Sequence, residues 1–302
     1  MAMPNNHLTM ESQEKLNDIL CCPECYYNLI KDEDLTCHSC RKHYPIYNGI
    51  PVPISDTELQ NQIADDRIDQ MHLKEIIKSK IPMPDERLWS PKAKKLIKKI
   101  LIEKNPESPN TYVVNMGSGV ESFYKKIFIS FKSLIRIGVP HSGYVNAYSD
   151  AMSLPLKSNS VDLFISSSVI EHLPDPEKAV SELFRTIKPG GLVYAEIPFI
   201  GAYHMAPHDY QRYTISGIEA LFSRHGFLFQ NKGICSGPVT AVVLLIQHAI
   251  VEAIPFGPIQ FLLRVILTWL FHPLKYLDYF FSRLKWGEYL ACNFFYLGRK
   301  PE

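Results

Sequence analysis

The chain has 302 residues, a formal net charge of +1 and a hydrophobic content of 46%. That length is enough for two domains, or for one domain with attachments, around a sizeable core. The near-zero charge excludes a general attraction to nucleic acid or to an anionic membrane surface. The N-terminal stretch has no apolar core of the kind that a secretory signal carries, and no run reaches the ~18 apolar residues of a spanning helix.

Four of the seven cysteines form two close pairs near the N-terminus, Cys22 with Cys25 and Cys37 with Cys40. Each two-residue gap lets a knuckle turn present both sulfurs to one ion, and four thiolates close a tetrahedral Zn²⁺ site. A closed four-sulfur site leaves no open coordination position, so we expect structural zinc in a module over residues 15–54. Paired cysteines of this kind indicate a reducing compartment, and we expect a cytoplasmic protein.

The module carries a pattern of C-P-x-C, then C-x-x-C, then YPIYNGIPV over residues 44–52. This pattern resembles the small zinc-ribbon proteins that activate tRNA and release-factor methyltransferases, and the resemblance spans nearly the whole module. In that family the ribbon is a docking and stabilising element, often fused to a methyltransferase. The resemblance therefore implies that the rest of the chain is the ribbon's partner.

Residues 55–105 are predicted to form a polar helical linker. In residues 106–302, apolar strand runs alternate with helical patterns, which predicts an α/β domain with a Rossmann-like, doubly wound and mostly parallel sheet. The strand candidates are TYVVNM, SLIRIGV, VDLFIS, GGLVYAEIPF and a final NFFYLGRK. The clearest helix follows Asp175, which can cap it, has Pro176 in its first turn and ends at residues 188–190.

The stretch VVNMGSGVES, which begins at Val113, runs from a strand into a loop with two glycines. Gly117 and Gly119 would let the backbone approach a ligand closely, with the N-terminus of the next helix behind it. In open parallel sheets, ligands bind at the carboxyl ends of the strands, near the switch in strand order. Taken alone, the glycine pair is equally well explained by a turn.

The order of motifs over residues 113–199 resembles class I S-adenosylmethionine (SAM)-dependent methyltransferases, a group that includes the ubiquinone-biosynthesis type. The matching parts are Gly117-Ser118-Gly119, Asp150-Ala151, LPL, VDLFISSSVIEHL and LFRTIKPGG. The later stretch YHMAPHDYQRYTISGIEALFSRHGF resembles the substrate-side loop and helix of bacterial members, including those found among glycan-biosynthesis enzymes.

The resemblance implies a SAM site. The glycine loop would wrap the methionine part of SAM, Asp150 would meet the adenine amino group, and Ser166 would lie under the cofactor. The implied cofactor-binding residues are Asn115, Gly117, Ser118, Gly119, Asp150, Ala151, Met152 and Ser166.

Two departures from the family pattern weaken the implied site. Family members usually carry an acid where Asn115 stands, and usually end the second strand with an acid that holds the ribose hydroxyls. Here that strand runs into Pro140 without a carboxylate. Asn115 can accept a hydrogen bond, but charge-assisted bonds are roughly twice as strong. The site is therefore either a weaker SAM site or a degenerate one.

Methyl transfer needs an oriented acceptor and, for hydroxyl or amine acceptors, a base. The candidate polar side chains are Glu171, His172, His204, His208, Asp209, Tyr210, Arg212 and Tyr213. Of these, His208, Asp209 and His172 are predicted to be catalytic. The alternative is that Asp209 pairs with Arg212 for structural reasons and that His208 simply packs.

The segment 238–285 is a strongly apolar insert with two helical runs. Trp269, with Arg264 and Lys275 on either side, suits a helix at a membrane interface, while a buried lid or a homodimer face through residues 240–281 is the alternative. We expect methyl transfer to an oxygen or nitrogen of a small, lipid-linked or glycan-linked acceptor. The alternatives are a ribosomal or transfer RNA methyltransferase, which the charge disfavours, and a degenerate interaction protein.

Overall fold

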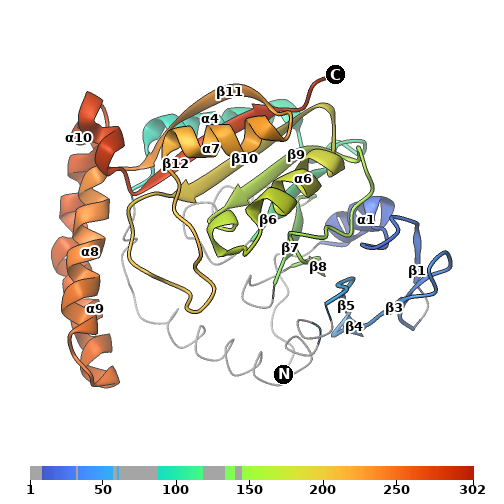
Figure 1. Ribbon diagram of the computed structural model, residues 1–302, viewed down its shortest axis with the longest axis horizontal. Coiled ribbons are helices and arrows are strands. Elements are labelled where there is room, and N and C mark those ends of the chain that lie inside the picture. The colour runs from blue at the N-terminus through green and yellow to red at the C-terminus, as the bar shows by residue number, and fades with distance from the viewer. Residues whose placement is uncertain (1–8, 32, 57–59, 61–87, 118–132, 140–144) are drawn as a thin grey trace.

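The computed structural model describes residues 9–31, 33–56, 60, 88–117, 133–139 and 145–302. Within them, a seven-stranded sheet has the order β11-β12-β10-β9-β6-β7-β8 (Figure 1). Its strands are β6 (Val113–Met116), β7 (Ile135–Gly138), β8 (Ala147–Tyr148), β9 (Val161–Ser167), β10 (Ile187–Pro198), β11 (Leu228–Ser236) and β12 (Asn293–Arg299).

The sheet has the topology of a doubly wound fold. Strands β6 to β10 pair in parallel, and β12 is antiparallel to its two neighbours, β10 and β11. Numbered along the chain, the first five strands lie in the order 3-2-1-4-5, as in dinucleotide-binding domains. The order reverses between β6 and β9, so the carboxyl ends of these two strands mark the expected ligand site. The predicted α/β fold is confirmed.

Helices cover both faces of this sheet, as expected for its mostly apolar and buried central strands. Helices α6 (Pro176–Thr186) and α7 (Ile215–Arg224) lie on one face, and α4 (Pro91–Lys104) lies on the other (Figure 1). Ala93, Ile97 and Leu101 place an apolar stripe of α4 against the sheet. Residues 91–104, which the sequence assigned to a linker, therefore pack as part of the α/β body.

The N-terminal module packs on the same body. Helix α1 (Met10–Ile19) precedes a three-stranded antiparallel sheet and a two-stranded hairpin. Their strands are β1 (Leu29–Lys31), β2 (Leu35–Cys37), β3 (His43–Tyr44), β4 (Ile46–Tyr47) and β5 (Ile50–Pro51). Leu16 of α1 and Tyr44 of β3 belong to the same buried cluster as Val114 and Phe164 of the large sheet. The two parts thus share one hydrophobic core.

Backbone contacts join the module to the body as well. The amide of Cys21 donates to the carbonyl of Pro155 at 2.9 Å, and the amide of Lys157 donates to the carbonyl of Ile19 at 2.8 Å. The buried ammonium of Lys15 donates to the carbonyl oxygens of Pro106, Ser108 and Thr111, in the segment that enters β6. Three acceptors use all three ammonium hydrogens, which fixes α1 against the start of the sheet.

The apolar insert forms a helical hairpin at the edge of the body, α8 (Pro238–Glu252) and α9 (Gly257–Phe271) (Figure 1). Three short elements follow: η3 (His272–Leu277), α10 (Asp278–Phe281) and η4 (Lys285–Leu290). The Asp278 carboxylate accepts the amides of Val239 and Thr240 at 2.8 and 3.0 Å, which caps α8 and anchors the hairpin. Among the described residues, we find no helix with the length and hydropathy needed to cross a membrane.

Candidate functional site

The four paired cysteines meet in the N-terminal module. The sulfur of Cys22 lies 3.6 Å from that of Cys40, and the sulfur of Cys25 lies 3.4 Å from that of Cys37. All four sulfurs lie within 4.8 Å of one another. With Zn–S bonds of about 2.3 Å, a tetrahedral site has sulfurs about 3.8 Å apart, so the cluster is compatible with zinc.

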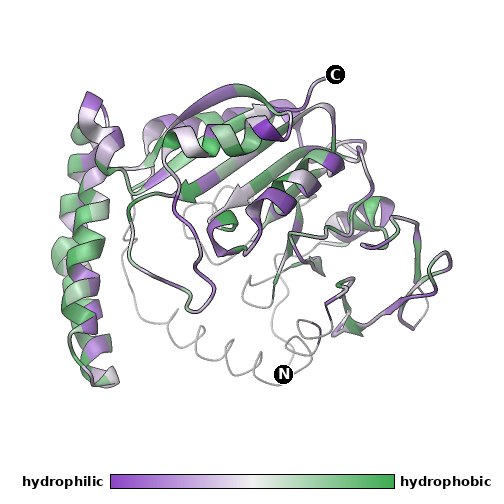
Figure 2. Cartoon of the chain, in the orientation of Figure 1, coloured by the Kyte–Doolittle hydropathy of each residue, from purple (hydrophilic) through white to green (hydrophobic). Residues whose placement is uncertain are grey.

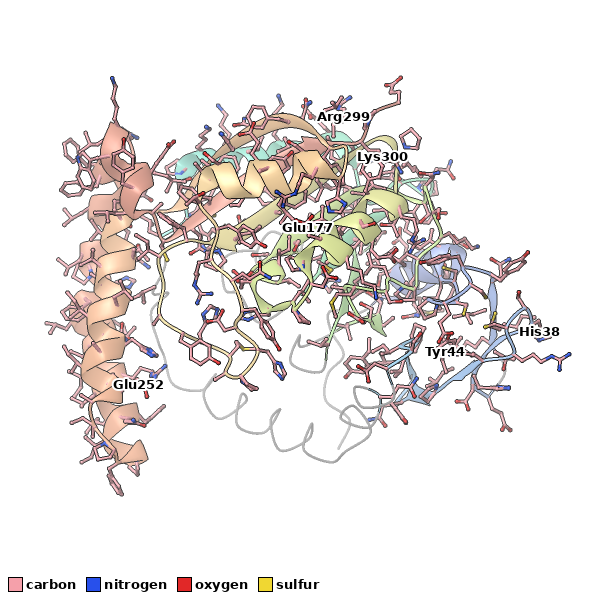
Figure 3. The ribbon with its side chains drawn as sticks, in the orientation of Figure 1. His38, Tyr44, Glu177, Glu252, Arg299 and Lys300 are labelled. Atoms are coloured by element: carbon pink, nitrogen blue, oxygen red, sulfur yellow. The ribbon has the colours of Figure 1, made fainter. Side chains whose placement is uncertain are left out.

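Neighbouring groups support this ligand set. The Tyr44 hydroxyl lies 3.2 Å from the Cys22 sulfur, an outer contact of the kind that orients metal ligands. His38 is exposed at the outer edge of the module (Figure 3). Cys21 is buried next to Cys22, but its sulfur is not one of the four that lie together.

At the switch point of the large sheet, three buried oxygens have no hydrogen-bond partner among the described residues. They are Asn115 Oδ1 at the end of β6, Ser166 Oγ in β9 and Ser168 Oγ just after it. Leaving a buried polar group unpaired costs about 1–3 kcal/mol. A ligand that brings donors to this edge of the sheet would remove that cost, so the residues fit a polar cofactor here.

Gly117, just after β6, lies close to Val169 in the segment that follows β9. Its φ of +71° lies in the left-handed region, and an added Cβ would overlap the side chain of Val169. Its amide donates to the carbonyl of Ile137 at 3.0 Å. Glycine is therefore required at this position for two independent reasons. Ser118 and Gly119, the other predicted loop residues, lie outside the described residues.

The predicted adenine contacts lie after β8. The Asp150 carboxylate accepts the Met152 amide at 2.8 Å, and burial raises the pKa of Asp150. Ala151 is buried beside them. Asp150 and Met152 line a pocket of about 730 Å³ between the N-terminal module and α6, with Pro23, Glu24, Tyr26, Ser55, Asp56, Ser153, Lys178, Ser181 and Glu182. The module thus forms one wall of the pocket at the predicted adenine end.

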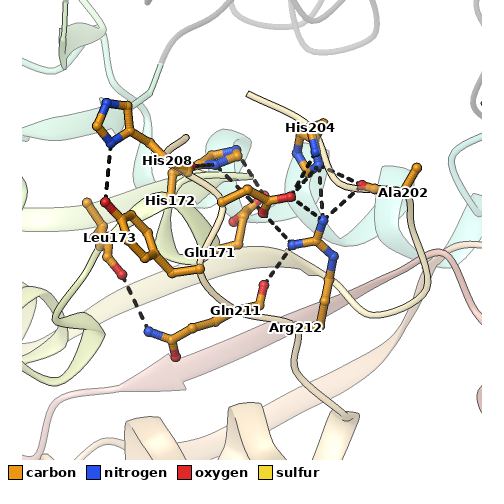
Figure 4. Close-up of polar contacts among 10 residues, drawn as sticks. Glu171, His172, Leu173, Ala202, His204, His208, Gln211 and Arg212 are labelled. Atoms are coloured by element: carbon orange, nitrogen blue, oxygen red, sulfur yellow. Dashed lines mark hydrogen bonds and ion pairs between the residues drawn. The ribbon is translucent and has the colours of Figure 1, made fainter. Parts of the chain in front are cut away.

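A polar cluster starts at the short helix η2 (Ile170–His172), which follows β9 (Figure 4). Glu171 is fully buried, and its carboxylate lies 3.8 Å from Nε2 of His172. The His172 and His204 rings meet edge to face with centroids 4.8 Å apart. Burial lowers the pKa of His204, which favours its neutral form at pH 7. The cluster therefore joins the end of β9 to the loop that follows β10.

Asp209 is engaged by Arg212. The guanidinium donates to both carboxylate oxygens of Asp209, at 2.5 and 2.6 Å, and these bonds lower the pKa of Asp209 to about 2. The same carboxylate accepts the amide of His204 at 2.9 Å. Asp209 is thus an ionised, fully paired carboxylate that positions its neighbours, as in the structural alternative considered from the sequence.

His208 contributes its backbone to the cluster and directs its ring elsewhere. Its carbonyl oxygen lies 2.6 Å from Nδ1 of His172. Its exposed ring lies beside the Tyr210 hydroxyl, away from His204 and Arg212 (Figure 4). The structure therefore brings His172 and Asp209 together and leaves the His208 ring outside. The amide of Tyr210 donates to the Glu171 carbonyl. This bond holds the loop after β10 against η2, where His204 contacts His172.

Two family models match the chain. A methyltransferase-domain model matches residues 138–195, and a Trm112p-like protein model matches residues 13–49. These matches confirm both resemblances noted in the sequence.

Among similar proteins, an uncharacterized methyltransferase of Mycobacteroides abscessus is 45% identical over 53 residues, 18% of this chain and 20% of that protein. One from Mycobacterium bovis is 52% identical over 42 residues, 14% and 16% of the two chains. The chain thus spans a fifth or less of the length of these curated relatives.

Solved structures give weaker likenesses. Phosphoethanolamine N-methyltransferase 2 of Haemonchus contortus, in complex with SAM, has a TM-score of 0.43 at 17% identity, covering 64% of this chain and 49% of that one. A complex of the Haloferax volcanii Trm112 methyltransferase activator has a TM-score of 0.42 at 15% identity, covering 81% and 98%. Because both TM-scores are below 0.5, we infer nothing about the ligands of this chain from these structures.

Proposed function

We propose that this chain is a SAM-dependent methyltransferase whose N-terminal zinc ribbon is part of its catalytic body. The observation that carries the proposal is a set of three oxygens at the switch point, of Asn115, Ser166 and Ser168, that have no hydrogen-bond partner among the described residues and lie beside a positive-φ glycine. The polar cluster at Glu171 begins three residues after Ser168, so a cofactor and an acceptor would meet at one edge of the sheet.

Several residues of this chain would hold SAM, which supplies an electrophilic methyl group when bound. Asn115 would accept a hydrogen bond from the amino group of the methionine part, Gly117 would let the backbone approach, and Asp150 would face adenine. Strand β7 ends at Gly138 without an acid in its four residues. We therefore expect binding without the charge assistance of the usual acids, and a correspondingly modest affinity.

On the acceptor side, we propose that His172 and His204 line the acceptor site. Both rings lie within the cluster, and the pKa of His204 is lowered by burial. We assign Asp209 a positioning role, because its carboxylate is already held by Arg212. His208 contacts the cluster through its carbonyl oxygen, so its side chain is not needed there.

Calorimetric titration with SAM tests the proposal. The unmodified protein should bind SAM, and Asn115→Leu should lose most of that affinity because the side chain can no longer accept a hydrogen bond. Asn110→Leu, at an exposed position, is the matched control and should bind normally. Absence of SAM binding to the unmodified protein would leave the degenerate interaction protein as the better account.

We further propose that the acceptor is lipid-linked and that the hairpin of α8 and α9 holds the enzyme at a membrane surface. Figure 2 shows the hairpin as predominantly hydrophobic. Neighbouring pairs such as Trp269 and Leu270 are both exposed, at 53% and 62%, so the apolar surface is wider than a stripe. Phe256, at the turn, is 57% exposed. Fifteen-residue helices are about 22 Å long, enough to enter one leaflet.

The two cations on either side of Trp269 are not free to bind lipid phosphates. Arg264 pairs with Glu252 at 3.1 Å, and Lys275 is buried. Membrane binding should therefore come from apolar burial, with little dependence on anionic lipid.

Co-sedimentation with phosphatidylcholine vesicles tests this docking. Trp269→Glu with Leu270→Glu should abolish binding, and Leu228→Glu with Phe229→Glu, an exposed apolar pair on β11, should not. If vesicles are not bound and light scattering shows a dimer that only the hairpin variant breaks, the hairpin is a subunit interface.

A further inference from the structure

We propose that Glu171, His172 and His204 form a binding site for one divalent first-row metal ion, separate from the zinc ribbon. One carboxylate oxygen and one nitrogen from each ring lie within 4.8 Å of one another. Two imidazoles and one carboxylate form a donor set that binds Zn²⁺ or Fe²⁺ and leaves coordination positions open. Glu171 is buried, His172 is 17% exposed and His204 is 36% exposed, so the site is partly buried and reachable from one side.

The hydrogen bonds of His172 prepare it to be a ligand. Its Nδ1 lies 2.6 Å from the carbonyl oxygen of His208, an acceptor that requires the proton on Nδ1. Nε2 then carries the lone pair, and this nitrogen is the one that lies 3.8 Å from the Glu171 carboxylate. Histidines that bind metals commonly donate their other ring N–H to a carbonyl or carboxylate in this way.

His204 is oriented in the same manner. Its Nδ1 lies 3.2 Å from the carbonyl oxygen of Ala202 and 3.3 Å from Oδ2 of Asp209. One donor, Nη2 of Arg212, also approaches Nδ1 at 3.1 Å, but this nitrogen has Ala202 and Asp209 as its own acceptors. Two acceptors thus favour a proton on Nδ1, which leaves Nε2 of His204 for a metal. The chain Asp209, His204, metal is an arrangement that zinc sites use.

The charge of the cluster favours a cation. Its described side chains include two carboxylates, Glu171 and Asp209, and one guanidinium, Arg212, which is committed to Asp209. Counted with neutral rings, these side chains carry one net negative charge, which favours a cation over an anion at this place. A divalent ion between Glu171 and the two rings would offset it.

The ion's chemical role rests on the proposed methyltransferase function. A metal ion lowers the pKa of an oxygen bound to it. A site at the end of β9 would therefore favour an acceptor that presents a hydroxyl over one that presents an amine.

Zinc counting tests the site. Protein saturated with Zn²⁺ and passed through a desalting column should hold two ions per chain by elemental analysis, one in the ribbon and one in the cluster. Glu171→Gln and His204→Gln should each hold one and, in calorimetry with Zn²⁺, should bind the second ion at least about 100-fold more weakly. His225→Gln is the matched control, because His225 with Glu177 is a surface pair that could bind zinc adventitiously.

The outcomes separate the site from the proposed function. One zinc in the unmodified protein, or two in both cluster variants, would overturn the site. Glu171→Gln nearly preserves the shape of the buried side chain, and near-ultraviolet circular dichroism of both variants distinguishes lost binding from lost folding. SAM titration of the same variants reports on the cofactor site independently, since neither residue lies in the predicted cofactor set.

Discussion

Replacing Gly117 by alanine tests how the two loops at the switch point pack. The residue has a φ of +71°, and its added Cβ would overlap Cγ2 of Val169. Placing alanine in the left-handed region costs about 1–2 kcal/mol. Forcing a methyl into an occupied space typically costs a further 1–3 kcal/mol or so. We therefore expect Gly117→Ala to lower the free energy of unfolding by about 2–5 kcal/mol.

A double-mutant cycle separates the two causes. Val169→Ala removes the methyl group that the new Cβ would meet but leaves the backbone conformation unchanged. In that background, Gly117→Ala should cost only about 1–2 kcal/mol, the backbone share. The difference between the two backgrounds is the coupling between Gly117 and Val169, which neighbours in contact show and distant residues do not.

Urea unfolding, followed by circular dichroism, measures these free energies for the four proteins of the cycle. SAM titration of the same proteins should show weaker binding whenever alanine stands at Gly117, because the loop backbone must shift. Equal costs of Gly117→Ala in both backgrounds would mean that the β6 loop does not pack on Val169, and the described switch point would be wrong.

Three further predictions concern the ribbon, the cofactor loop and the acceptor cluster. Cys25→Ser should release zinc and lower the unfolding midpoint of the whole chain, because ribbon and body share one core; elemental analysis and thermal denaturation check this. Asn115→Asp should tighten SAM binding about tenfold by charge assistance while destabilising the unliganded protein, which calorimetry and urea unfolding measure. Asp209→Asn should cost about 2 kcal/mol at pH 7, because the pKa of Asp209 lies near 2 rather than 3.8. That difference from the unmodified protein should shrink as the pH falls from about 4 to about 2 in acid-unfolding measurements.

Much of the fold could be predicted from the sequence, because local patterns encode it. The strand runs around Val113 and Val161 are mostly apolar, and both become central strands. Asp175 caps α6 as expected, accepting the Lys178 amide at 3.0 Å. The four cysteine ligands could be predicted from their spacing alone, because the two cysteines of each pair lie on the same short turn.

Other parts depend on contacts that local patterns do not encode. Strand β11 was not predicted, because LFQNKGICS is half polar. Within the described sheet it is an edge strand whose neighbouring strand is β12. In the sequence, helix α4 resembles a polar linker because many lysines lie between the residues of its apolar stripe. His204 joins Glu171 through the path of a loop, 33 positions along the chain, and no local pattern distinguishes it from His208, which was chosen instead.

The ribbon's attachment to the body has a consequence for how its docking responds to dilution. Separate subunits part when their concentrations fall below their dissociation constant, but a covalently linked pair meets at an effective concentration on the order of millimolar. Here the surface that carries Ile19, Leu20 and Cys21 is already occupied by residues 155–157 of the same chain. A free ribbon protein would have to displace this built-in copy. The fraction of chains with a docked ribbon should therefore not depend on the concentration of this protein. It should also not depend on the concentration of other ribbon proteins.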